Sequence, residues 1–343
     1  MKIYLKGNWE FAGKPIYQGF ASAWEKIGYD VQLFNDTPTP DLIDGEYEIM
    51  MTDYDLALPQ LYIQAGSRGE LVSSTHPDTG KAMSPKETVE VCHRITQEMQ
   101  EVLRNAKKVY MYVQPTKFPL PWGENLNFRS MATGTPLIEW VNQSENTVLW
   151  QWGEMTDEIK REYFFEWKHI TKVPLAFDSI SYKPIKDPAY NYDVCYVGGW
   201  ANNGFNEKKQ IMMEHFKPLM KMGLKCGVFI NKGLSHEQEN LILYNSKVAL
   251  NIHDSYQRIL GNDSNERTFK SLGLTGALVC DNIRQISSMF PDLPLYDSPG
   301  EMVEQIASYL ENEKLLKETK DHYRQLIADN HTYVHRVEQM RDL

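Results

Sequence analysis

Several common features are missing from this sequence of 343 residues, and each absence excludes a class of protein. No apolar run is long enough to span a bilayer, and the chain opens directly on a predicted strand without a signal-peptide core. The four cysteines lie far apart without a CxxC pair, which predicts buried thiols in a reducing compartment. We therefore expect a soluble, cytoplasmic protein that needs no disulfide framework.

An excess of positive charge is also missing. Lysine and arginine total 36 against 46 acidic residues, for a formal net charge of −10. This balance argues against a general nucleic-acid surface and against an anionic membrane as partner. An anionic ligand would need local basic groups and helix termini instead.

Familiar catalytic and metal-binding motifs are absent as well. The chain has no P-loop, no GxSxG and no HExxH. Gly198 and Gly199 follow a predicted strand but do not form a full GxGxxG, so a dinucleotide-binding fingerprint is not supported. His76 and Asp78 have no third ligand nearby, which makes a zinc site improbable. We expect no bound metal ion and no cofactor.

The composition and the order of apolar runs indicate an α/β protein of two domains. Hydrophobic residues make up 42% and charged residues 24%, the profile of a globular chain with enough length for two cores. In the first half, apolar runs of strand type alternate with amphipathic helical patterns, as in a doubly wound sheet. The strands expected there are 2–6, 30–34, 48–51, 108–113, 137–140 and 147–150, and the helices are 16–27 and 87–105.

The second half repeats this alternation after a polar, proline-punctuated segment at 183–188, which is typical of a linker. Its expected strands are 193–197, 226–230, 248–252, 277–280 and 293–296, and its expected helices are 208–222, 267–274, 299–312, 313–330 and 331–343. We predict two Rossmann-like, doubly wound parallel-sheet domains that face each other across a cleft. Their predicted bounds are 1–172 and 186–330, followed by a terminal helix at 331–343.

The most informative stretch is 246–282, which reads as strand, polar loop, helix, glycine and strand. A helix that opens at the carboxyl end of a parallel strand presents free N–H groups and a dipole that favour an anion. Arg267 in the first turn could add a bidentate contact to phosphate. The alternative is that Glu266 and Arg267 form an ordinary solvated first turn.

Other candidate residues have structural alternatives too. Gly198 and Gly199 would let the backbone approach a ligand closely, but a tight turn explains them equally. Asn251 and His253 end a strand on the side where that turn should lie, and His253 could be a purely structural histidine. We expect Lys208 and its neighbour Lys209 to be surface charges, with contact to phosphate as the alternative.

The first half offers fewer candidates. Asp53 and Asp55 follow a predicted strand and could act as a base or hold a metal, although a turn is the simpler interpretation. Asn8 and Trp9 follow the first strand and could bind a sugar, because a ring face stacks on indole while hydroxyls form hydrogen bonds.

Several ordered blocks in the second half carry a resemblance. They are 173–178, 192–199, 244–253, 265–269, 276–279 and 331–336. Together they resemble the spore-protein glycosyltransferase-like family (CgeB type) within the GT-B superfamily. The first half resembles this family only in its βαβ layout.

The resemblance implies a GT-B fold and a glycosyltransferase whose nucleotide-sugar donor binds mainly to the second domain. The donor-site residues that it implies are Gly198, Gly199, Asn251, His253, Asn265, Glu266, Arg267 and Thr268. It also implies that the terminal helix crosses back to the first domain. Related retaining enzymes carry a glutamate where this chain has Ser271, preceded by Lys270, which leaves the stereochemical outcome open.

We therefore expect a metal-independent hexosyl- or related glycosyltransferase that acts on a glycan or protein. The acceptor would lie on the side of Asn8 and Trp9, and Asp53 or Asp55 would supply the base. A noncatalytic nucleotide-sugar or glycan-binding protein and a sugar-nucleotide epimerase of the same fold remain alternatives.

Overall fold

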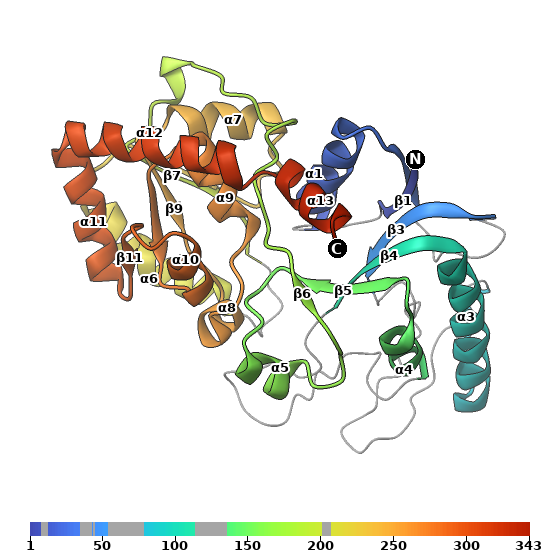
Figure 1. Ribbon diagram of the computed structural model, residues 1–343. Coiled ribbons are helices and arrows are strands. Elements are labelled where there is room, and N and C mark those ends of the chain that lie inside the picture. Colours follow the sequence, from blue (N-terminus) through green and yellow to red (C-terminus); the bar gives the residue numbers. More distant parts are fainter. Residues whose placement is uncertain (8–12, 35–42, 44, 54–78, 114–135, 201–206) are drawn as a thin grey trace.

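The structure is a computed structural model that describes residues 1–7, 13–34, 43, 45–53, 79–113, 136–200 and 207–343. Within these residues the chain forms two parallel β-sheets, each with its own helices (Figure 1). Predicted strands and helices recur in both halves, so the expected α/β class with two parallel-sheet domains is confirmed.

The N-terminal domain is built on a six-stranded sheet of order β2-β1-β3-β4-β5-β6, with every neighbouring pair parallel. Its strands are β1 (Lys2–Lys6), β2 (Asp30–Phe34), β3 (Tyr47–Asp53), β4 (Ala106–Tyr112), β5 (Thr147–Gln151) and β6 (Thr171–Lys172). Its helices are α1 (Gly13–Lys26), α3 (Pro85–Asn105), α4 (Pro136–Gln143) and α5 (Asp157–Tyr163).

The C-terminal domain has a five-stranded sheet of order β11-β10-β9-β7-β8, again parallel throughout. Its strands are β7 (Val194–Gly198), β8 (Cys226–Ile230), β9 (Val248–Asn251), β10 (Leu278–Asp281) and β11 (Leu295–Tyr296). The central strands β9 and β10 are buried at every position, which is why they appear in the sequence as unbroken apolar runs.

Helices follow along the C-terminal half of the chain, all but the last belonging to this second domain, and a short 3₁₀ turn, Pro188–Tyr190, precedes the sheet. The helices are α6 (Lys208–Lys221), α7 (His236–Asn245), α8 (Ser255–Leu260), α9 (Glu266–Leu274), α10 (Arg284–Met289), α11 (Pro299–Glu311), α12 (Glu313–Asn330) and α13 (Tyr333–Arg341). The short helices α5, α7 and α8 were missed in the sequence, although their N-caps Thr156, Ser235 and Asp254 each accept a first-turn N–H.

One strand prediction is wrong. The segment 137–140, expected to be a strand, lies inside helix α4. Ile138 and Val141 are buried while Glu139 between them is exposed, a spacing of three that fits one face of a helix. An apolar run of four residues does not distinguish a strand from a buried helix turn, so the period was misread.

The last helix lies against the N-terminal domain rather than against the sheet that precedes it. In Figure 1, α12 runs along the C-terminal domain and α13 continues beside α1. The Tyr110 hydroxyl of β4 donates to the Met340 carbonyl oxygen at 2.5 Å, and the rings of Phe20 and Tyr333 are 4.8 Å apart. The chain therefore connects the two domains at two places.

Both connections are joined to each other. Phe177, in the segment that leads into the C-terminal domain, pairs with Thr332 just before α13. The buried Arg336 donates from Nε to the Pro174 carbonyl oxygen at 2.9 Å. The two sequence blocks 173–178 and 331–336 thus meet in space.

Candidate functional site

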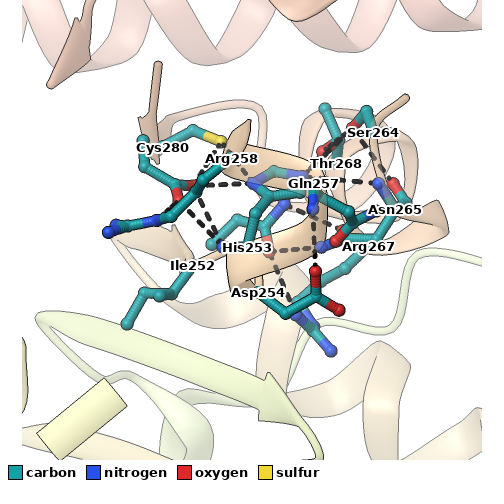
Figure 2. A network of polar contacts seen from close by, with 12 residues as sticks. Ile252, His253, Asp254, Gln257, Arg258, Ser264, Asn265, Arg267, Thr268 and Cys280 are labelled. Carbon is teal, nitrogen blue, oxygen red and sulfur yellow. Dashed lines mark hydrogen bonds and ion pairs between the residues drawn. The ribbon is translucent and has the colours of Figure 1, made fainter. Parts of the chain in front are cut away.

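The candidate site lies where the strand order of the C-terminal sheet reverses. Strand β7 has β8 on one side and β9 on the other, so successive connections leave in opposite directions from this point. Ligands of open parallel sheets bind outside the carboxyl ends of the strands at such a reversal. Here the carboxyl ends of β7 and β9 meet the N-terminus of α9, and a network of polar side chains joins them (Figure 2).

Asn251 is the centre of this network. It ends β9 and is fully buried. Its Nδ2 donates to Asn265 Oδ1 at 2.9 Å and to Thr268 Oγ1 at 2.8 Å, while its Oδ1 accepts from the Arg267 guanidinium at 3.0 Å. One side chain therefore fixes the three residues that open α9.

Arg267 is a half-buried cation that neutral groups hold in place. Its Nε donates to the Val197 carbonyl oxygen at 2.6 Å, and the guanidinium lies over the ring of Tyr196, 5.0 Å from the centroid. A Cβ on Gly198 would collide with the guanidinium, so glycine is needed there for this fold-back. Among the described residues, no acidic side chain lies within ion-pair distance of Arg267. Its charge is available for an anion.

The first turn of α9 also leaves donors available. Asn265 has the extended backbone of an N-cap, but its side chain turns to Asn251 and does not cap the helix. The first N–H groups of a helix have no partner within the helix. An anion beside Arg267 would meet both these donors and the positive end of the dipole.

His253 contacts the residue directly before α9 and holds it in place. Its Nδ1 lies 2.6 Å from Asp281 Oδ1, and its Nε2 accepts from the Asn265 backbone N–H at 3.3 Å. Burial lowers the pKa of His253, so the ring is neutral with its proton on Nδ1. Although burial opposes it, contacts with His253 and Arg258 hold the pKa of Asp281 well below its usual range. The histidine acts as a rigid support.

The same corner holds three groups of the kind that bind metals. One donor atom each of His253, Cys280 and Asp281 lies within 4.8 Å of the other two, and all three residues are buried. Asp281 is already occupied by the histidine and by Arg258 Nε at 2.8 Å, and burial raises the pKa of the Cys280 thiol well above its usual value. The contact between His253 and Asp281 is that of a hydrogen-bonded pair, and a protonated Cys280 thiol is a poor metal ligand. The three side chains are therefore better explained as structural groups than as a metal site.

Lys208 corrects the expectation of a surface charge. It is only 6% exposed, and its Nζ donates to the carbonyl oxygen of Ile252, just beyond β9. Burial, helped by the nearby charge of Arg267, lowers the pKa of Lys208 to about 7. A second group that can carry a positive charge therefore lies at the carboxyl end of β9. Its burial is not visible in the sequence, because α6 starts with two adjacent lysines.

Gly199 is explained by a residue that sequence reasoning missed. Asn231, after β8, has a left-handed backbone (φ 52°), and its side chain exchanges two hydrogen bonds of 3.2 Å with the Trp200 backbone. A Cβ on Gly199 would collide with the Asn231 amide. The turn after β7 is therefore held in one shape. An asparagine directly after a strand was the available signal.

Glu266 does not project into solvent as an ordinary first turn would. Its side chain is 13% exposed and lies 3.5 Å from the Lys270 ammonium, which also contacts Glu239 at 2.8 Å. Burial raises the pKa of Glu266. Lys270, which directly precedes the position where related retaining enzymes carry a glutamate, is thus the centre of a buried charged cluster that reaches Tyr182 through Glu239.

The structure does not describe the side chains of the candidate residues in the N-terminal domain. Asp53 ends β3, and its side chain lies outside the described residues, as do Asn8, Trp9 and Asp55 entirely. Of the predicted donor-site residues, the structure brings Gly198, Asn251 and Arg267 into direct contact, joined by Asn265 and Thr268.

Comparisons with known proteins agree with this geometry. A family model described as glycosyl transferase-like matches residues 196–342, which include the whole network. No curated protein matches the chain. None of the helices in the described part of the chain is both long and apolar enough to cross a bilayer.

Solved structures of GT-B glycosyltransferases match almost the full chain. Sucrose-phosphate synthase from Thermosynechococcus elongatus has a TM-score of 0.59 at 9% identity, covering 100% of this chain and 98% of that one. A mutant of T4 phage β-glucosyltransferase with UDP-glucose has a TM-score of 0.54 at 13% identity, with coverages of 98% and 97%. An α-glucosyltransferase with UDP and a DNA 13-mer has a TM-score of 0.57 at 12% identity, with coverages of 100% and 99%. The fold is GT-B.

Proposed function

We propose that this protein is a glycosyltransferase that moves a sugar from a nucleotide-sugar donor to a glycan or protein acceptor. One observation carries the proposal: Arg267, a half-buried cation without an ion-pair partner among the described residues, lies beside the uncapped N-terminus of α9 where the strand order reverses. A cation beside free N–H groups at a helix start is a typical arrangement for binding a phosphate group. The glycosyl transferase-like match over 196–342 and the GT-B fold support it.

The donor diphosphate would lie on the first turn of α9. As the bond between sugar and phosphate breaks, negative charge grows on the leaving diphosphate, and groups already aimed at it stabilise the transition state. Arg267 supplies a fixed positive charge, and Lys208 supplies a second one when protonated. Asn251 and His253 act indirectly, because they hold Arg267 and Asn265 in place.

The reaction needs no metal in this scheme, because Arg267 and the helix dipole meet the phosphate charge. We also propose a hexose as the transferred sugar and a relationship to the CgeB-type subfamily. The acceptor and its base would come from the N-terminal domain, with Asp53 or Asp55 as base and Asn8 or Trp9 as acceptor contacts. Two matching structures of an α-glucosyltransferase contain DNA, but the net charge of −10 favours a glycan or protein here.

The test is a transfer assay. Purified protein is incubated with the UDP, GDP and ADP esters of hexoses and with glycan, peptide and duplex DNA acceptors, and products are weighed by mass spectrometry. We expect one acceptor class to gain the mass of one hexose. Conversion of the free nucleotide sugar into an isomer would indicate an epimerase, and tight binding without turnover would indicate a noncatalytic binding protein; either result would refute the proposal.

A further inference from the structure

Lys208 lies where a positive charge is unfavourable, and three features of its surroundings contribute to this. The side chain is buried, and moving a charge from water into a protein interior is costly. Lys208 is also the first residue of α6, so it lies at the positive end of that helix dipole. The third feature is the nearby charge of Arg267. The neutral amine is therefore favoured as long as no anion is bound.

The carboxylates near Lys208 offset these effects only in part. Among the described residues, the charged groups that act on Lys208 come from α9, β10, α8 and the residue before α8; they are Arg267, Asp281, Arg258 and Asp254. Both carboxylates have other partners. Asp281 accepts from Arg258 Nε at 2.8 Å, and Asp254 caps α8 by accepting from a first-turn N–H at 2.9 Å. The balance leaves Lys208 with a pKa of about 7.

The hydrogen bond of Lys208 is compatible with either protonation state. Its Nζ donates to the Ile252 carbonyl oxygen, and a neutral amine can donate to a carbonyl as an ammonium group does. Ile252 directly follows Asn251, whose side chain accepts from the Arg267 guanidinium at 3.0 Å. Lys208 therefore lies next to the residues that position Arg267, and it can gain a proton without losing its contact to β9.

A bound diphosphate would reverse the balance of charge around Lys208. The diphosphate of a nucleotide sugar carries a negative charge on each phosphate, and an opposite charge within about 4–6 Å favours the charged form of a titratable group. We propose that Lys208 binds the donor diphosphate as an ammonium group, and that donor binding is coupled to the uptake of a proton by this residue. This inference rests on the proposed function.

The coupling fixes the direction of a pH effect and the range in which it occurs. Below about pH 7 Lys208 is already protonated in the free protein, so donor binding takes up little and the affinity is constant. Above about pH 7 the proton must come from solvent, and the dissociation constant of the donor should rise by up to about tenfold per pH unit. Donor binding is thus most sensitive to pH just above neutrality.

Calorimetry with the UDP, GDP and ADP esters of glucose measures this proton directly. The heat of binding varies with the ionisation enthalpy of the buffer in proportion to the number of protons taken up. The phosphates of these esters do not titrate near neutral pH, so a proton that is taken up goes to the protein. We expect the wild type to take up about one proton per donor at about pH 8 and almost none at about pH 6.

Two variants assign the proton to Lys208, and melting temperatures verify their folding. Lys208→Met cannot be protonated, so it should bind the donor without proton uptake, and below about pH 7 roughly tenfold more weakly than wild type. Lys208→Arg carries a fixed charge and should also bind without uptake, with an affinity that does not fall above neutral pH. Lys217→Met, the same replacement at an exposed position of α6, is the control and should keep the wild-type uptake.

The outcomes separate this inference from the proposed function. Donor binding by the wild type without proton uptake at about pH 8 would overturn the inference while the proposed function stands. Uptake that persists in a folded Lys208→Met or Lys208→Arg protein would do the same, because another group would then take the proton. If the wild type binds none of the three esters, the proposed function fails and the inference with it.

Discussion

Replacing Arg267 by alanine removes the fixed positive charge that is proposed to contact the donor phosphates. A charge-assisted hydrogen bond contributes about 1.5–3 kcal/mol, so the dissociation constant of the nucleoside diphosphate should rise by a factor of roughly 10 to 150. The fold should persist, because among the described residues the arginine donates hydrogen bonds to the Val197 carbonyl oxygen and to Asn251, and its side chain is half-buried.

Calorimetry with UDP, GDP and ADP measures the loss, and thermal melting verifies folding. Arg341→Ala is the matched control, since it removes an arginine from an exposed part of α13 whose carboxylate partner is its neighbour Asp342. Gly198→Ala is a second variant that keeps the charge and displaces it, because the added Cβ would collide with the guanidinium. It should weaken binding in the same direction. Unchanged affinity in a folded Arg267→Ala protein would remove this residue from the site.

Three further predictions concern metal, motion and pH. Glycosyl transfer should survive EDTA; strict dependence on added manganese or magnesium would contradict this and would move Asp53 and Asp55 into the donor site. Small-angle scattering should show compaction on saturation with nucleotide sugar, because closure excludes water from the reacting centre, whereas identical profiles with binding confirmed would mean that donor alone does not close the protein. Between about pH 7 and 10.5 the buried Lys208 is neutral in the folded protein and protonated in the unfolded chain, so the free energy of unfolding should rise with pH there by at most about 1.4 kcal/mol per unit. Lys208→Met should flatten that slope in denaturant titrations, and an unchanged slope would mean that Lys208 is charged when folded.

Much of the fold follows from the sequence because parallel strands buried on both faces are continuous apolar runs. Strands β7, β9 and β10 were predicted for this reason. The segment 137–140 was misread because a short apolar run carries no period of its own. Short helices such as α8 depend on a single cap and on tertiary contacts, which local patterns do not reveal.

The part of the site that depends on the order of strands and helices along the sequence was predictable. Arg267 and Thr268 open a helix between two buried strands, and that order is visible in the sequence. Burial and side-chain contacts are not visible: Lys208 looks like any surface lysine, and Asn231 looks like an ordinary turn residue. Their roles depend on which groups the fold brings near them, the Ile252 carbonyl oxygen for Lys208 and the Trp200 backbone for Asn231.

The most direct test of the central claim is a crystal structure of the protein with a bound nucleotide sugar. Crystals soaked with the UDP, GDP and ADP esters of glucose should show the diphosphate on the first turn of α9. Phosphate oxygens should lie within hydrogen-bond distance of the Arg267 guanidinium and of the backbone N–H groups that open the helix. A diphosphate bound elsewhere, with the start of α9 occupied only by water, would contradict it.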